Sequence, residues 1–510
     1  MTWNGARPAP WSEIFGVRPA PARFRSGLIA AVSTAVPILI GQRTGQASLG
    51  LVASSGALAA LYSGSGRSPR AEAVEVGLAA TGLTASFAVG TALAGHPWVN
   101  VAGNALWAAV ATAACALARA RPPGIVMLVL LATVGGGLPP GQPGQRIAAV
   151  AAVAFGAAAL CWLAAFAHRP RPEETGRAQA PPEGTAFAAL PLALRSLPSS
   201  PIPLMSARTG IGVGLAGAAA QLCQLDRPYW AMAAAGAVMA RGSFAGGTRT
   251  LALLRGTGTA AGCLLAGAVA AVRPEGAAIA LVLAALTFVT ELVVVHNYAA
   301  AMVFVTPLST VLVAAASHDT AVVALAGDRL LETLLGCLAA VVAGQLVTGR
   351  WALRQRQEAV ARVLLAVADL MEEPTRAGRF TALHQAHLQL QLVGDRTAAE
   401  RPTVRTAASP LDHVVEAARD LALHHLTSHH LDGRPWSRRA TAGPLPAVPV
   451  AVPVHIAEAR RLAGLLLSPA DGGPTADAPQ ILSPDLARLR TTIYDWAASA
   501  VPLTNERRTR

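Results

Sequence analysis

Long apolar runs separated by short polar or basic breaks fill the first 350 residues. A helix of about twenty predominantly apolar residues is long enough to cross a bilayer. The pattern predicts spans at about 24–41, 47–63, 72–94, 98–118, 124–138, 146–168, 208–224, 229–244, 250–272, 276–295, 298–316 and 322–348. We therefore predict an all-α polytopic membrane protein with about twelve transmembrane helices.

The two apolar halves resemble each other in their polar positions. Arg25-Ser26-Gly27 recurs as Arg208-Thr209-Gly210, and Arg146 recurs as Arg329, in both cases 183 residues further along the chain. An even number of spans in each copy makes the copies parallel, related by an axis along the membrane normal. We predict two parallel six-helix repeats with a path between them.

The pattern changes near residue 350. Val360, Val363, Leu364 and Val367 follow the three- and four-residue spacing of amphipathic helices that have one buried face. Prolines and charges interrupt the chain between the two apolar halves. The predicted organisation is an N-terminal cytoplasmic segment 1–22, a first repeat 23–168, a cytoplasmic linker 169–206, a second repeat 207–349, a cytoplasmic helical domain 350–500 and a disordered basic tail 501–510.

Composition supports the membrane assignment and adds an orientation. Only 14% of the 510 residues are charged, against about 25% in soluble proteins, and the formal net charge is +13. Arginines gather before the first span and after the second, fourth, sixth, eighth and twelfth spans, so we expect both termini to be cytoplasmic at a plasma (inner) membrane. No nucleic-acid-binding motif accompanies the positive charge, so we expect no nucleic acid partner.

Arginines and carboxylates inside the predicted spans are the first candidates for function. A charge such as Arg255 costs about 2.5–3.5 kcal/mol in an apolar segment, so it faces a partner, a cavity or the membrane edge. Arg329 and Arg146 occupy matched positions of the two repeats, where they would attract an anion. Glu332 and Glu291 are candidates for proton coupling, but Glu332 is also placed to pair with Arg329, three residues earlier on one helix.

Polar and aromatic residues in the second half extend this candidate site. Asn297, Tyr298 and Thr306 would orient an anion, and Tyr229 and Trp230 would contact an aromatic ring. Local explanations stay open: an aromatic belt for Tyr229 and Trp230, and a helix kink near Thr306. Three secondary basic positions complete the set: Arg249, for which a topology charge is the simpler role, Arg208 and Arg25.

Several other chemistries find no support. Residues 212–217 match a dinucleotide-binding fingerprint by letter, but they follow no strand, and small-residue helix packing accounts for them. The sequence has no P-loop, no zinc-protease motif and no nucleophile elbow. The five cysteines show no metal-ligand spacing. We expect no enzyme activity, no cofactor and no metal site.

Four motifs of the second half occur together in one known family. Residues 229–239, 255–262, 297–307 and 329–336 resemble the fusaric acid resistance, or aromatic acid exporter, superfamily of integral membrane transporters. The likeness covers roughly residues 205–350 and extends more weakly over the first half. The resemblance implies efflux of small organic anions, notably aromatic carboxylates.

Three functional hypotheses remain at this point. The first is an exporter of small organic anions that uses the path between the repeats, with proton coupling as an option. The second is a passive organic-anion channel on the same scaffold. The third is a membrane scaffold that acts through its cytoplasmic helical domain. Expected partners are the anion, the lipid bilayer, and an adaptor protein or a second copy of the chain.

Overall fold

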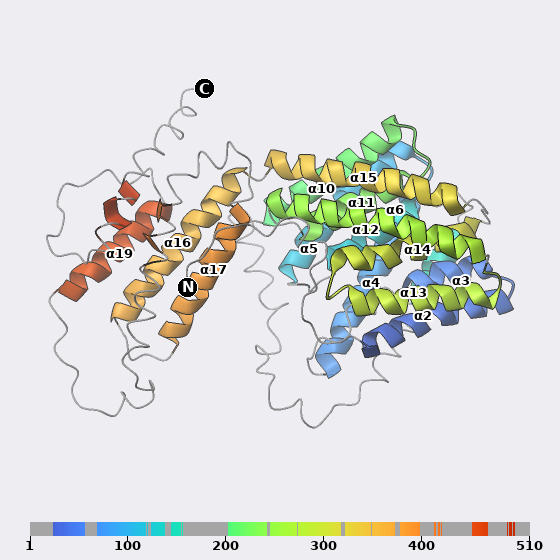
Figure 1. Ribbon diagram of the computed structural model, residues 1–510, viewed down its shortest axis with the longest axis horizontal. Helices are drawn as coiled ribbons and strands as arrows, with labels where there is room; N and C mark the ends of the chain where they lie inside the picture. The colour runs from blue at the N-terminus through green and yellow to red at the C-terminus, as the bar shows by residue number, and fades with distance from the viewer. Residues whose placement is uncertain are drawn as a thin grey trace. The chain divides into compact units, whose positions relative to one another are not determined.

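A computed structural model of the protein describes residues 24–56, 69–118, 120, 124–137, 144–154, 156, 202–241, 245–272, 274–317, 322–347, 349–372, 378–397 and 451–467, with single residues between 413 and 494. Regular structure in these residues is helical throughout, and it divides into two compact units, which are described separately (Figure 1).

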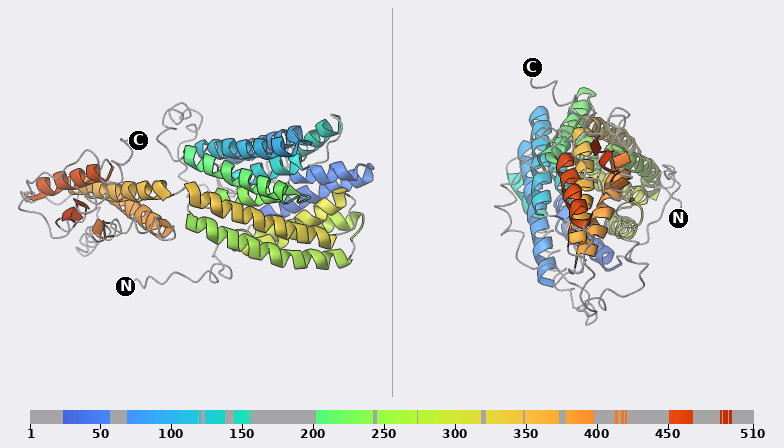
Figure 2. Two further views of the ribbon diagram at one scale, coloured as in Figure 1. Left: turned by 90° about the horizontal axis from the view of Figure 1, so that it is seen from above. Right: turned by 90° about the vertical axis from the view of Figure 1, so that its left-hand side faces the viewer.

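The first unit contains the apolar helices. They are α2 (Phe24–Arg43), α3 (Ala47–Ser54), α4 (Pro69–Leu93), α5 (Pro97–Leu117), α6 (Ile125–Gly136), a helix over Gly144–Ala154, α10 (Ile202–Leu222), α11 (Pro228–Arg241), α12 (Ala245–Val272), α13 (Ala277–Val293), α14 (Tyr298–Ser317) and α15 (Val322–Val347). Their axes run roughly along one direction (Figure 2).

Five stretches of this unit are long and apolar enough to cross a bilayer: Ser26–Arg43, Val74–Leu93, Pro97–Leu117, Gly247–Val272 and Tyr298–Ala315. Shorter apolar helices, α6, α13 and Gly144–Ala154, accompany them. The protein is therefore a polytopic helical membrane protein.

The two halves of this unit exchange helix contacts. Helix α10 packs against α5, and α2 packs against α13. Helix α11 also contacts α6, and α14 contacts α3. Each of these pairs joins a helix of the first half to one of the second, so the halves form a single bundle.

Close helix contacts in the second half depend on glycine. A Cβ at Gly336 of α15 would collide with the Ala231 carbonyl of α11, and one at Gly258 of α12 would collide with the Ala299 carbonyl of α14. Membrane helices use small residues in this way to bring backbones together. These contacts hold α11, α12, α14 and α15 as one packed group.

The turn between α13 and α14 lies beside the middle of α12. Helix α13 has 17 residues and α12 has 28, so α13 is about 25 Å long beside a helix of about 42 Å. Because Gly258, midway along α12, meets Ala299, the first turn of α14 is level with that midpoint. This arrangement brings Tyr298 to the height of Arg255.

Helix α10 begins earlier than the sequence predicts. It starts at Ile202, inside the segment 169–206 that we expected to be a linker. The prolines there suggested a break, but Pro203 is the second residue of the helix. The first turn tolerates proline because its N–H has no intrahelical acceptor.

The second unit contains α16 (Gly349–Glu372), α17 (Arg379–Thr397) and α19 (Ala451–Leu467). The predicted apolar face of α16, Val360, Val363, Leu364 and Val367, is fully buried and forms a core with side chains of α17 and α19. Much of the predicted helical domain 350–500 after residue 397, apart from α19, lies outside the described residues.

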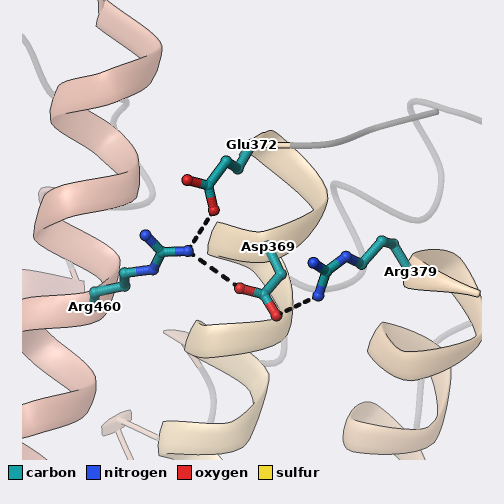
Figure 3. Close-up of polar contacts among 4 residues, drawn as sticks. All are labelled: Asp369, Glu372, Arg379 and Arg460. Carbon is teal, nitrogen blue, oxygen red and sulfur yellow. Dashed lines mark hydrogen bonds and ion pairs between the residues drawn. The ribbon is translucent and has the colours of Figure 1, made fainter. Parts of the chain in front are cut away.

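A cluster of ion pairs connects the three helices of this unit (Figure 3). Asp369 of α16 accepts from Arg379 of α17 at 2.6 Å and from Arg460 of α19 at 3.3 Å. Arg460 also reaches Glu372 at 2.5 Å. The arginines of this cluster therefore have carboxylate partners.

Candidate anion-binding site

Arg255 is buried inside the bundle, 6% exposed. Its Nη1 donates to the hydroxyl oxygen of Tyr298 at 2.9 Å and lies 3.6 Å from the sulfur of Met302. Its Nε is buried and has no hydrogen-bond partner among the described residues. The side chain therefore points into the group formed by α12 and α14, with donor capacity left over.

Arg329, on α15, is also buried, 4% exposed. Its guanidinium carbon lies 4.7 Å from the centroid of the Trp230 ring, within the range of a cation–π contact. Its Nη1 is buried without a hydrogen-bond partner in the described part of the chain. It contacts an aromatic ring and forms no ion pair with a carboxylate in the described part of the chain.

The two guanidinium groups are carried by helices that contact each other. The contact is between α12 and α15, where the Cys263 thiol of α12 donates to the Ala326 carbonyl of α15 at 3.1 Å. Neither arginine forms an ion pair within the described residues. The Glu332 carboxylate is close enough to act on Arg329 electrostatically, although it forms no ion pair with it. Buried positive charge is costly unless it is compensated, which makes the two arginines candidates for binding an anion.

Glu332 does not pair with Arg329, as its position three residues later on the helix had suggested. Its Oε1 accepts from the backbone N–H of Arg227 at 2.9 Å, and its Oε2 is buried without a partner in the described chain. The Arg329 guanidinium is over the Trp230 ring instead. Tertiary contacts on both side chains have overridden the local helical spacing.

The aromatic pair lies inside the protein. Trp230 is 2% exposed, which does not fit an aromatic belt facing the membrane interface. Its ring meets the Tyr229 ring edge-on, with centroids 5.4 Å apart. A Cβ at Gly137, after α6, would collide with the Tyr229 ring, so first-half residues approach the site here.

Asn297 and Thr306 take part in local structure. The Asn297 side-chain oxygen accepts from the N–H of Ala300 at 3.0 Å, which caps the start of α14. The Thr306 hydroxyl donates to the Met302 carbonyl at 2.9 Å, one turn earlier on the same helix. Tyr298 is the member of this predicted group that contacts an arginine of the site.

The other predicted residues lie apart from this group. Arg208 is buried and donates to the Thr248 hydroxyl, Arg249 is exposed, and Glu291 is buried on α13. Arg146 is partly exposed on the helix Gly144–Ala154. None of the described hydrogen bonds, ion pairs or ring contacts joins these four to Arg255 or Arg329. The side chain of Arg25 lies outside the described residues.

Arg227 is the contact that sequence reasoning missed. It is not among the predicted site residues, yet its side chain reaches Asp328 of α15 at 3.4 Å and lies 5.9 Å from the centroid of the Trp230 ring. Its position directly before Pro228, Tyr229 and Trp230 was the available signal.

Comparison with known proteins gives a family match for the segment that contains the buried arginines. Residues 215–343, which are 129 of the 510, match the family described as fusaric acid resistance protein-like. This segment is fusaric acid resistance protein-like. The resemblance predicted from the sequence motifs is thereby confirmed for these residues, and the family is one associated with transport and efflux.

A curated relative of the chain is itself a membrane protein. The uncharacterized membrane protein YvaC of Bacillus subtilis is 32% identical over 142 residues, which are 28% of this chain and 20% of YvaC. The alignment thus spans about a fifth of that relative's length. No solved structure matches the chain. The fusaric acid resistance protein-like segment includes Arg255, Arg329, Trp230 and Tyr298.

Proposed function

We propose that this protein is a transporter of the plasma (inner) membrane that exports small organic anions such as aromatic carboxylates. In this proposal about twelve spans form two parallel six-helix repeats, the anion passes between them, and both termini are cytoplasmic. The α16–α19 unit is then a cytoplasmic helical domain. The fusaric acid resistance-like match supports the class of function.

The paired guanidinium groups carry the proposal. Arg255 and Arg329 are buried, lie on contacting helices and keep unpartnered N–H groups within the described residues. A carboxylate between them would accept charge-assisted hydrogen bonds from both and compensate their charge. The protein maintains a costly positive site, and an anionic ligand accounts for that cost.

The aromatic residues of the site support an aromatic substrate. The Trp230 ring is next to the Arg329 guanidinium, and the Tyr298 hydroxyl is bonded to Arg255. A ligand with its carboxylate at the guanidinium groups would place an aromatic ring near these side chains, where edge or stacked contacts are favourable.

Helix packing supports the duplicated architecture. The contact of α10 with α5 mirrors that of α2 with α13, because α2 and α10 begin the halves and α5 and α13 occupy the same later place in each. The contact of α11 with α6 likewise mirrors that of α3 with α14. Such reciprocal exchange is expected of two repeats related by an axis along the membrane normal.

Glu332 is the first candidate for proton coupling, and Glu291 is the second. Glu332 is 1% exposed and one of its oxygens has no partner among the described residues, so a proton could bind there. Protonation would remove the negative charge of Glu332 near Arg329 and so strengthen anion binding. The anion and a proton would then cross the membrane together.

The test is uptake of radiolabelled benzoate by proteoliposomes that contain the purified protein. We expect Arg255→Gln to lower the rate of uptake at least about tenfold, since a hydrogen bond to a charged group contributes about 1.5–3 kcal/mol. Arg43→Gln, a change of an exposed arginine at the end of α2, is the matched control and should retain the rate. Wild-type uptake by a correctly folded Arg255→Gln protein would overturn the proposal.

The same preparation separates a carrier from a passive channel. A carrier gives saturable uptake and no resolvable single-channel current in a planar bilayer. Unitary benzoate currents that persist without a proton gradient would show that the protein is a passive channel rather than a carrier.

A further inference from the structure

The turn between α10 and α11 is held on α15 by two contacts. The Arg227 backbone N–H donates to Glu332 at 2.9 Å, and its side chain reaches Asp328 at 3.4 Å. Within the same turn Gln224 has a φ of 53°, a left-handed conformation that costs energy for a residue other than glycine. The two contacts of Arg227 with α15 fix this residue in position and help to hold the turn.

Two guanidinium groups lie near the Trp230 ring. Arg227 is 5.9 Å and Arg329 is 4.7 Å from its centroid. The two arginines differ in exposure: the Arg227 side chain is 21% exposed, whereas Arg329 is 4% exposed. An anion arriving from outside this end of the bundle would meet Arg227 before Arg329.

We propose that Arg227 is a second anion-binding residue, which passes the anion to or from the buried Arg329 site and is occupied by Asp328 when no anion is bound. The inference rests on the transport function proposed above. Its ligand class is the same, a small carboxylate, and Asp328 is the carboxylate that takes the ligand's place.

The Arg227–Asp328 pair suits exchange with a ligand. Its 3.4 Å separation is long for a charge-assisted hydrogen bond, and Asp328 is 43% exposed. Exposed pairs of this kind are weak, so an incoming carboxylate can replace Asp328 on Arg227. The Arg227 backbone bond to Glu332 remains during the exchange and keeps the turn in place.

A purely structural pair makes a different prediction. If Arg227 and Asp328 only hold the turn, removing either charge weakens the site, and both variants bind the anion less well. If Asp328 competes with the anion, removing its charge strengthens binding, and removing the Arg227 charge weakens it. The two substitutions then act in opposite directions.

The test is equilibrium binding of radiolabelled benzoate to the full-length protein in nanodiscs. We expect Asp328→Asn to lower the Kd about two- to fivefold and Arg227→Gln to raise it by a similar factor, in line with the strength of exposed ion pairs. The double variant should bind like Arg227→Gln. Asp226→Asn removes the same charge from an exposed neighbour in the turn, and its Kd should equal that of the wild type.

A Kd for Asp328→Asn that is unchanged or higher would overturn the role of Arg227. So would an Asp226→Asn effect equal to that of Asp328→Asn, because general charge attraction would then explain both. A different result would contradict the proposed function itself: an Arg255→Gln protein that binds benzoate with the same Kd as the wild type.

Discussion

Arg460 of the α16–α19 unit differs in burial and in partners from Arg255 and Arg329 of the apolar unit. In the α16–α19 unit, Arg460 lies at the surface and is paired with Asp369 and Glu372 (Figure 3). In the apolar unit, Arg255 and Arg329 are buried, lie on contacting helices and form no ion pair among the described residues. Paired surface arginines need no ligand, whereas buried arginines that form no ion pair are candidates for binding one.

The largest expected effect falls on transport. Arg329→Gln should lower benzoate uptake at least about tenfold, as should Arg255→Gln, because each removes a charged hydrogen-bond donor from the ligand. The double substitution should cost less than the product of the single effects, because both side chains bind one anion. The measurement is the rate of benzoate uptake by the wild type, the two single variants and the double variant. Effects that multiply fully would show that the arginines act on separate ligands.

A second prediction concerns stability, which we expect the substitution to leave unchanged or increase. Arg255→Met should not lower the free energy of unfolding while it abolishes uptake, because it removes the cost of a buried charge that has no carboxylate partner. Thermal unfolding of the purified protein in detergent measures this. A large loss of stability would mean that the charge is structurally compensated.

A smaller effect is expected from Tyr298→Phe. This change removes the acceptor of the 2.9 Å hydrogen bond from Arg255 and leaves the ring in place. Uptake should fall several-fold through a higher KM for benzoate, because the guanidinium loses the partner that orients it. A fall in kcat with KM unchanged would argue against an orienting role.

The smallest effect is expected at the surface cluster of the second unit. Arg460→Gln should leave benzoate uptake unchanged and only slightly speed amide hydrogen exchange in α19. Its exposed ion pairs are weak and screened by salt, so 1 M NaCl should remove the difference between variant and wild type. A large increase in exchange would show that the ion pairs, rather than the apolar core, hold α19.

The helices of the second half follow from the sequence almost residue by residue. The predicted spans 276–295 and 322–348 correspond to α13 (Ala277–Val293) and α15 (Val322–Val347). Apolar runs bounded by glycine, proline and charges define membrane helices strongly, because backbone and side-chain polarity must both be satisfied within the bilayer. The starts of α10 and α12 are exceptions: α10 begins at Ile202 rather than near 208, because prolines are ambiguous near a helix start, and α12 begins at Ala245 rather than near 250.

The site was only partly predictable, because its contacts are tertiary. Arg255, Arg329 and Tyr298 stood out as polar residues in apolar runs. The partner of Glu332 could not be predicted, since helical spacing pointed to Arg329 and the actual donor, Arg227, is 105 residues away. The depth of the α13–α14 turn, which brings Tyr298 to Arg255, depends on the packing of Gly258.

The most direct test of the paired arginines as an anion site is the melting temperature of the purified protein with and without benzoate. A ligand that binds only the folded state stabilises it. The account predicts that saturating benzoate raises the melting temperature of the wild type and of Arg43→Gln, and leaves that of the Arg255→Gln, Arg329→Gln double variant unchanged. An equal rise in the double variant would contradict it.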